Sequence, residues 1–201
     1  MKRLMYGAAV AVTALSAQAA LAQSDFSFRG VRGEIQMGPA MFHSENRHNT
    51  NVGFGGELGA DFNVGDKIVV GAAGTYFLTE QNAENTKYVT GGRVYHKSFS
   101  EYGGTIRAGY VVVPNLLLYG TAGYVWNDQR RALIRTTGTS PTTGAGTTAY
   151  YRTYTTDGWQ AGVGAEYDLN GMFYLNSQIK YSQYYHTARS RSVVGIGVRF
   201  K

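Results

Sequence analysis

Two short segments contain the residue types that nucleophilic or metal chemistry requires. The first, "FHSENRHN", carries His43, Ser44, Glu45 and His48, and the second, "HKSFSE", carries His96, Ser98 and Glu101. A hydroxyl becomes a nucleophile when a neighbouring base takes its proton and a third group orients that base. Imidazole and carboxylate groups also bind transition metals. Both segments are therefore candidates for a reactive site.

The spacing in these segments does not favour a metal or cofactor site. His43, Glu45 and His48 follow no recognised metal-ligand pattern, and both segments are polar enough to be solvated loops. A glycine-rich stretch, "GFGGELG", resembles a dinucleotide fingerprint only superficially, because its glycines are spaced G-x-G-x-x-x-G and no helix follows. We therefore predict no catalytic residue, no metal ion and no cofactor.

The first 22 residues have the layout of a secretory signal peptide. Lys2 and Arg3 precede an apolar stretch that ends at Ala20-Leu21-Ala22, a small-x-small cleavage site. The apolar stretch is shorter than the roughly 20 residues of a membrane-spanning helix. We expect cleavage after Ala22, which leaves residues 23–201 as one domain and lowers the net charge from +6 to +4.

The composition excludes two other classes of protein. The chain has no cysteine, so an exported domain of this kind cannot be a disulfide scaffold. Its positive charge and its 16 tyrosines could indicate nucleic-acid binding, but export from the cytoplasm argues against such a partner. No further domain is expected beyond the barrel that the remaining sequence predicts.

Eight segments of the exported chain alternate apolar and polar residues with period two, which is typical of β-strands. They are residues 28–37, 51–62, 67–78, 102–112, 116–126, 157–169, 173–182 and 190–201. Short turns follow the second, fourth and sixth segments, and the last of these contains Asn170-Gly171, a strong hairpin signal. The predicted long polar connections are Pro39 to Asn51, Thr79 to Glu101, Asn127 to Thr156 and Tyr184 to Ser190.

An even number of strands joined alternately by short and long connections is the pattern of an outer-membrane barrel. The sequence thus predicts an all-β fold, an eight-stranded antiparallel up-and-down transmembrane β-barrel. The polar faces of the segments are rich in glycine and carry seven charged residues that we assign to the lumen: Glu34, Glu57, Asp61, Arg107, Glu166, Lys180 and Arg199. Because unpaired buried charge is costly, these residues should pair inside the barrel, with glycine leaving room for the long side chains. The apolar faces then contact lipid, with Tyr and Trp near the strand ends as interfacial girdles.

The chain resembles the eight-stranded outer-membrane β-barrel family. It is similar to the OmpA-type membrane domain, and more closely to the opacity-like surface proteins and "porin family" proteins of alphaproteobacteria. The resemblance covers nearly all of residues 23–201 and lies in the signal peptide, the strands around "RAGY" and "GAEY", and the terminal "GIGVRF". It implies a cell outer membrane location in a Gram-negative bacterium and recognition of the last strand by the barrel-assembly machinery. Gly195, Val198 and Phe200 match that assembly signal, whereas Lys201 departs from it because the family usually ends on the aromatic.

Some barrels of this kind modify lipid A with a loop-proximal His, a Ser and an acid. His96 and Ser98 resemble the lipid A deacylase arrangement, but Tyr110 occupies the region where a partner Glu is expected. We therefore predict that the chain is not an enzyme. The favoured role is structural, in envelope integrity or surface contact, with a lumen filled by charged side chains. A narrow channel for small solutes and, less favoured, a lipid A-modifying enzyme are the alternatives.

Arginines in the predicted long connections indicate contact with lipopolysaccharide, whose phosphates favour arginine partners. Four lie around the longest connection: Arg130, Arg131, Arg135 and Arg152. Arg189 and Arg191 flank the last connection and are predicted at the same outer rim. The expected partners are outer-membrane lipids, lipopolysaccharide and the assembly machinery, and no motif identifies an external ligand or host surface.

Overall fold

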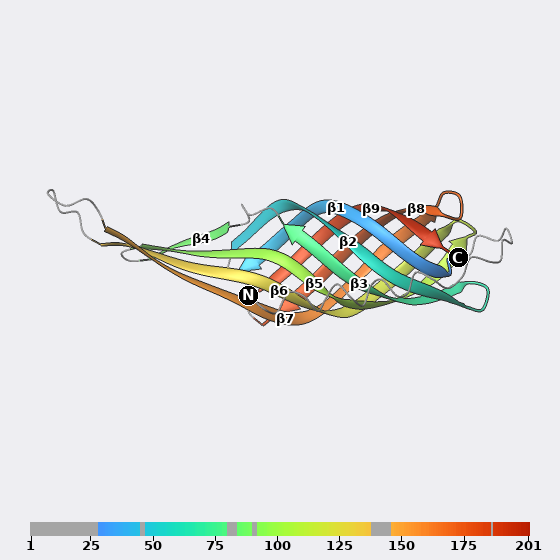
Figure 1. Cartoon of the computed structure of the whole chain (residues 1–201), viewed down its shortest axis with the longest axis horizontal. Coiled ribbons are helices and arrows are strands. Elements are labelled where there is room, and N and C mark those ends of the chain that lie inside the picture. Colours follow the sequence, from blue (N-terminus) through green and yellow to red (C-terminus); the bar gives the residue numbers. More distant parts are fainter. Residues whose placement is uncertain (1–27, 45–46, 80–83, 90–91, 138–145, 186) are drawn as a thin grey trace.

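The computed structural model describes residues 28–44, 47–79, 84–89, 92–137, 146–185 and 187–201. The predicted signal peptide, residues 1–22, lies outside the described part of the chain. The strands are β1 (Gly30–Ser44), β2 (Arg47–Val64), β3 (Ile68–Thr79), β4 (Glu84–Val89), β5 (Gly92–Val113), β6 (Leu116–Thr137), β7 (Gly146–Asp168), β8 (Phe173–Tyr184) and β9 (Ala188–Phe200). All of them belong to one antiparallel sheet (Figure 1).

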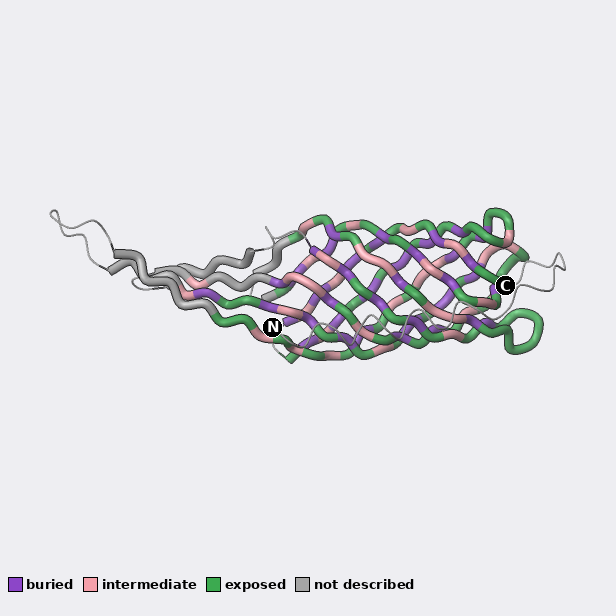
Figure 2. The backbone as a smooth tube through the Cα atoms, viewed as in Figure 1, coloured by how far each residue is buried: buried purple, intermediate pink, exposed green. Residues whose placement is uncertain are grey.

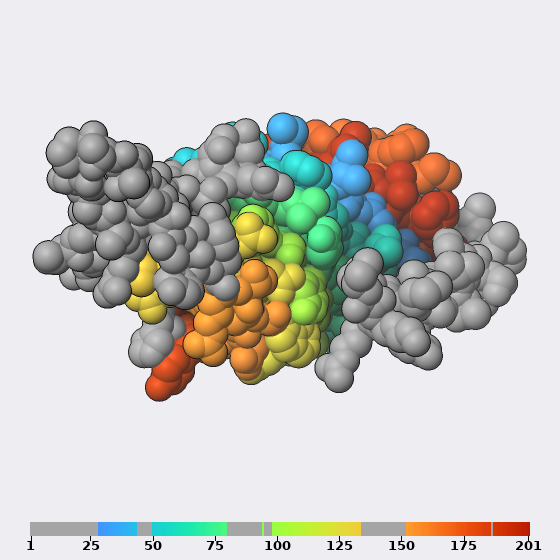
Figure 3. Space-filling model, turned by 60° about the vertical axis from the view of Figure 1, so that its left-hand side comes forward, coloured from blue at the N-terminus to red at the C-terminus, as the bar shows by residue number. Residues whose placement is uncertain are grey.

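Eight of these strands close into a ring. The order is β3-β2-β1-β9-β8-β7-β6-β5, and additional pairing of β3 with β5 joins the two ends. The last strand pairs with the first, from Val31 opposite Phe200 to His43 opposite Ala188. The space-filling view shows this contact, with the blue β1 and the red β9 packed together along the wall (Figure 3). The predicted closed, eight-stranded antiparallel barrel is confirmed.

One end of the barrel, called the turn end, has tight connections. Gly65 and Gly171 adopt positive φ angles of 72° and 81° in the connections from β2 to β3 and from β7 to β8. Glycine accepts this conformation without steric cost. The side chain of Asn170 accepts hydrogen bonds from the backbone N–H of Met172 and Phe173. These turns set the register of the hairpins that carry the lumen residues.

The opposite end, called the loop end, differs from the prediction. Residues 39–44 and 47–51 belong to β1 and β2, so the first connection is short. β5, β6 and β7 are 22, 22 and 23 residues long, about twice the 9–11 residues that cross a bilayer. They project beyond the ring together with β4, which pairs with β5 (Figure 1). The segments predicted as long loops are therefore largely strand, because threonine and tyrosine favour extended pairing there.

The barrel wall is apolar outside and polar inside. Ile35, Ile106 and Ile179 are 60–70% exposed on the outer face, whereas Arg32, Asp61 and Glu166 are at most 1% exposed. Buried and exposed residues alternate along much of β3, β8 and β9 (Figure 2). A barrel in water would bury its apolar side chains, so this distribution requires an apolar solvent around the wall. Among the described residues, no helix is long and apolar enough to cross a membrane.

An aromatic belt marks the outer face towards the loop end. Tyr102 lies opposite both Tyr76 of β3 and Trp126 of β6, and its ring stacks on Trp126 with centroids 5.9 Å apart. Trp159 of β7 packs against Tyr181 of β8 at 5.8 Å. Their exposed, amphipathic rings suit the boundary between hydrocarbon and headgroups. The belt separates the lipid-facing wall from the projecting sheet.

Candidate functional site in the barrel lumen

The turn end of the lumen holds eight charged side chains, called the turn-end cluster below. Each is at most 5% exposed, and together they come from six strands of the ring. The members are Arg32, Glu34, Glu57, Asp61, Arg107, Glu166, Lys180 and Arg199. Asp168 is also buried at this end, but its carboxylate accepts from the backbone N–H of Gly171 in the turn and is counted separately. Four carboxylates face four cations, so the cluster is neutral as a whole.

Asp61 and Glu166 are the two carboxylates on which the arginines converge. Arg107 donates to Asp61 through Nε at 2.7 Å and Nη2 at 2.5 Å, and to Glu166 through Nη1 at 2.9 Å. Arg199 donates to Glu166 at 2.5 Å and lies 3.5 Å from Asp61, while Arg32 Nε is 3.1 Å from Asp61. Asp61 therefore neutralises guanidinium groups from three different strands. Multiple, partly bidentate pairing offsets the cost of burying these charges.

A second group of contacts continues the cluster towards the middle of the lumen. Glu57 accepts from Arg32 Nη2 at 2.6 Å and from Lys180 Nζ at 2.8 Å. Glu34 accepts from the Asn176 amide at 2.7 Å and lies 4.0 Å from Arg32. Arg32 thus links the two groups into one network.

Apolar side chains close the turn end beneath these charges. Phe28, Val69, Leu117 and Tyr119 form a buried cluster. Arg199 lies over the ring of Phe28 at 5.4 Å, and Arg107 lies over the ring of Tyr119 at 5.0 Å. The charged network therefore rests on an apolar layer at the turn end of the lumen.

Glycine makes room for this network at two positions. A Cβ atom on Gly71 would overlap the carboxylate of Asp61, and one on Gly197 would overlap the ring of Tyr174. Both glycines have ordinary strand conformations, so the requirement is space and not backbone freedom. This arrangement agrees with the idea that missing side chains accommodate long lumen residues.

The loop end of the lumen holds a second, smaller group, called the loop-end cluster: Glu101, Arg189, Arg191 and the polar side chains around them. Glu101 accepts from Arg191 Nη1 at 2.5 Å, from Gln160 at 2.9 Å and from the Tyr184 hydroxyl. Arg189 Nη2 donates to Ser98 Oγ at 2.5 Å, and its Nη1 lies 3.8 Å from Glu101. One carboxylate here serves two guanidinium groups.

The lumen also holds a band of uncharged polar side chains, although Lys180 of the turn-end cluster lies directly opposite Arg191 of the loop-end cluster. Gln36, Thr75, Thr121 and Gln178 are 2–8% exposed and point into the lumen. Their side-chain N and O atoms have no hydrogen-bond partner within the described part of the chain. These four side chains therefore contribute buried polar groups that the described chain does not satisfy.

The structure brings together all seven residues that the sequence assigns to the lumen, since each belongs to the turn-end cluster. Sequence reasoning missed Arg32 and Glu101 as lumen residues. Arg32 lies in phase with Glu34 and Gln36 on β1, so its alternation contained the signal. Glu101 lies in phase with Thr105 and Arg107 on β5, and it was missed because the predicted segment began one residue later, at residue 102.

The predicted position of Arg189 and Arg191 at the outer rim is wrong. They are 1% and 3% exposed and face the lumen from β9. Both lie in phase with Arg199, because residues two apart on a strand share a face. β9 begins at Ala188, two residues before the predicted segment, and Arg191 already lay within that segment.

The candidate catalytic segments do not form a constellation in the described structure. Ser98 Oγ donates to Asn127 and accepts from Arg189, and the carboxylate of Glu101 is taken up by the loop-end cluster. His43 is exposed, while the side chains of His48 and His96 lie outside the described residues, as do the side chain of Ser44 and all of Glu45. No group of three or more His, Cys, Asp or Glu that could hold a metal occurs among the described residues.

The remaining predicted residues lie on the projecting sheet and on the last strand. Arg130 and Arg131 of β6 and Arg152 of β7 are exposed, and the side chain of Arg135 is not described. Arg130 lies over the ring of Phe99 at 5.4 Å. On β9, the proposed assembly residues Gly195, Val198 and Phe200 pair with Gln36, Gly33 and Val31 of β1.

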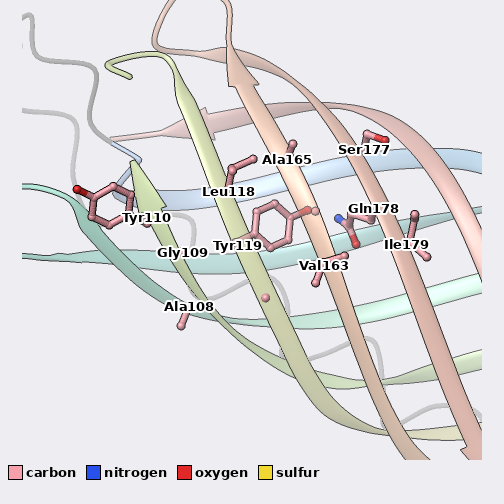
Figure 4. A pocket seen from close by; sticks show the side chains of 12 residues that line it. Ala108, Gly109, Tyr110, Leu118, Tyr119, Val163, Ala165, Ser177, Gln178 and Ile179 are labelled. Carbon is pink, nitrogen blue, oxygen red and sulfur yellow. The ribbon is translucent and has the colours of Figure 1, made fainter. Parts of the chain in front are cut away.

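Outside the ring, small residues leave shallow hollows in the wall. One of them lies across β5, β6, β7 and β8, where Ala108 and Ala165 sit between the larger Leu118, Val163 and Ile179 (Figure 4). The outward-facing side chains of this hollow are mostly apolar, with Ser177 as a polar exception. The enclosed polar chemistry of the molecule is therefore confined to the lumen.

Comparisons with known proteins agree with this architecture. Residues 7–200 match the model of the family described as outer membrane protein beta-barrel domain. The chain is similar to Ail, the attachment invasion locus protein of Yersinia pestis, at 14% identity over 86% of this chain and 99% of that chain, with a TM-score of 0.56. A structure of Ail in complex with the heparin analogue sucrose octasulfate gives the same identity and coverage and a TM-score of 0.54. Neisserial surface protein A is 13% identical over 85% of this chain and 97% of that chain, with a TM-score of 0.49. No curated protein sequence is a match for this chain.

Proposed function

We propose that this chain, which belongs to the outer membrane protein β-barrel domain family, is a non-enzymatic integral barrel with a structural or surface-contact role in the outer membrane. The observation that carries the proposal is the filling of the lumen. Paired charges occupy its turn end, and the cluster of Phe28, Val69, Leu117 and Tyr119 closes it. A lumen blocked in this way argues against transport. It supports a function carried out by the outer wall and the projecting sheet.

The test of the blocked lumen is conductance in planar bilayers. The purified full-length protein should give no stable unitary openings. Thr121 faces the middle of the lumen and its neighbour Ala122 faces lipid, so Thr121→Phe and Ala122→Phe form a matched pair. Stable openings that Thr121→Phe abolishes and Ala122→Phe preserves would refute the proposal that the lumen is blocked.

The second candidate, a narrow channel for small solutes, is favoured by one specific observation. The polar band of Gln36, Thr75, Thr121 and Gln178 contains buried groups without partners in the described chain, and such groups could line a water path. The turn-end layer opposes this function because a solute would have to displace Phe28 and Leu117. The bilayer experiment decides between the two candidates.

A lipid A-modifying activity is the least favoured candidate. Ser98 Oγ is engaged by Arg189 and Asn127, so a nucleophilic role would first require these contacts to break. Mass spectrometry of lipid A from strains that express the wild-type chain or His96→Ala tests the activity. Identical lipid A profiles are expected, and a mass difference that depends on His96 would establish the enzyme.

The exposed arginines of the projecting sheet are proposed to bind lipopolysaccharide phosphates in the outer leaflet. Guanidinium groups suit this because they pair with phosphate in a bidentate manner. The four positions are Arg130, Arg131, Arg135 and Arg152. Replacing them together with glutamine should reduce lipopolysaccharide co-purification and shift the heat-dependent gel mobility. Unchanged co-purification and unchanged mobility would exclude this contact.

A further inference from the structure

The two charged clusters of the lumen differ in their charge balance. The turn-end cluster contains four carboxylates and four cations, so its charges cancel. In the loop-end cluster, Glu101 is the one described carboxylate within contact of Arg189 and Arg191. Both arginines are at most 3% exposed. The described loop end thus buries one positive charge in excess, which is unfavourable unless a negative group accompanies it.

The excess charge has free donors. Arginine carries five N–H donors in a rigid fork. Arg191 uses Nη1 for Glu101, and its Nε and Nη2 have no hydrogen-bond partner among the described residues. Arg189 uses Nη2 for Ser98, and its Nε and Nη1 have none either. Four buried N–H-bearing atoms on two neighbouring side chains therefore remain available.

The surroundings of Arg191 restrict a partner of these donors to the plane of the guanidinium group. The ring of Phe77 lies under Arg191 at 4.7 Å and covers its face. Phe77 packs with Ala40 and Val193, so this side of the cluster is apolar. Stacking on the face leaves the in-plane N–H edge as the direction from which a partner can approach. An apolar wall also lowers the local dielectric response and strengthens the attraction of an anion.

We propose that Arg189 and Arg191 bind a small monovalent inorganic anion, of the size of chloride, at the loop end of the lumen. One negative charge neutralises the excess, and a compact ion can accept from both guanidinium edges without disturbing the bond between Arg191 and Glu101. The site is independent of whether the lumen conducts, and so it goes beyond the function proposed above.

The test uses the full-length protein refolded in detergent micelles. Chloride replaces gluconate at constant sodium concentration and constant ionic strength, so general screening stays the same. A ligand that binds the folded state alone raises its stability as its concentration grows. The urea midpoint should therefore rise with chloride, and the ³⁵Cl resonance should broaden in the presence of the barrel and narrow again when bromide competes.

Three variants locate the site. Arg189→Gln should abolish both effects while Arg191 keeps its bond to Glu101. Arg130→Gln, which removes an exposed arginine at the same end of the molecule, should preserve both. Glu101→Gln should raise the affinity for chloride about tenfold or more, because it removes a nearby negative charge from a buried site. A heat-dependent gel shift confirms that each variant is folded.

Several results would overturn the proposal. If chloride neither stabilises the wild-type protein nor gives a broadened ³⁵Cl resonance at constant ionic strength, the proposal is refuted without any variant. Retention of both effects in Arg189→Gln, or their equal loss in Arg130→Gln, would assign the binding to another surface. If Glu101→Gln does not fold, the bromide competition on the wild-type protein still tests the proposal. A specific site releases chloride at a defined bromide concentration, whereas unspecific screening does not.

Discussion

Replacing Asp61 with asparagine removes the negative charge that three buried arginines share. Asp61 lies within 2.5–3.5 Å of guanidinium nitrogens of Arg32, Arg107 and Arg199, and it is 1% exposed. Asparagine has nearly the same shape, so packing is preserved while the turn-end cluster gains one uncompensated positive charge. Removing one partner of a buried ion pair costs about 3–5 kcal/mol. We expect the free energy of unfolding to fall by about that amount.

The assay is urea unfolding of the refolded protein in micelles at neutral pH, followed by tryptophan fluorescence and by heat-dependent gel mobility. Asp157→Asn is the matched control. Asp157 is exposed and accepts a hydrogen bond from the Tyr124 hydroxyl, so its replacement should cost no more than about 1 kcal/mol. Adding Arg199→Gln to Asp61→Asn should recover part of the loss, because the double variant restores neutrality.

An equal and small loss in Asp61→Asn and Asp157→Asn would refute the reasoning. Such a result would mean that water screens the turn-end cluster as effectively as it screens an exposed pair. A double variant that is destabilised by the full sum of the single losses would refute the shared-charge argument in particular, since independent sites add and members of one network do not.

Two further predictions concern the wall. Gly71→Ala should destabilise the barrel by about 1–3 kcal/mol, because its Cβ would overlap the Asp61 carboxylate. A Cβ on Gly74 of the same strand meets nothing within 4 Å, so Gly74→Ala should be neutral or slightly stabilising. Equal urea midpoints of the two variants would contradict the argument that Gly71 is needed for space. Phe200→Ala should reduce the fraction of barrel assembled in cells, which the heat-dependent gel shift measures. Val194→Ala, on the same strand and the same face, should leave that fraction unchanged. Equal assembly of both variants would argue against Phe200 as part of the assembly signal.

The sequence predicted the ring of strands because the bilayer imposes strict alternation on every residue that crosses it. Outside the bilayer this constraint ends, and the segments from Thr79 to Glu101 and from Asn127 to Thr156 were interpreted as loops although they extend β5, β6 and β7. In the structure these segments pair with neighbouring strands along β5, β6 and β7. Composition alone could not distinguish such a sheet from a solvated loop.

The lumen residues were also predictable only in part. Alternation was enough to place Asp61, Arg107 and Glu166 inside, because each lies on a membrane-crossing segment with a clear apolar face. Which of them touch was not predictable, because the contacts join residues 46–138 positions apart on strands that meet across the lumen. The inclination and stagger of the strands determine these partners, and a period-two pattern carries no information on either.

The distribution of the Asp61 contacts over β1, β5 and β9 has a consequence for how the barrel enters the membrane. The β1–β2 hairpin has one arginine of the turn-end cluster, Arg32, for three carboxylates, so it is not neutral by itself. A half-formed sheet in hydrocarbon would therefore present charged groups that water can no longer solvate. The charges cancel only when the first and last strands have met. Insertion should therefore be an all-or-none event that requires these charges to be paired. Intermediates with an open ring should remain on the aqueous side until the ring closes.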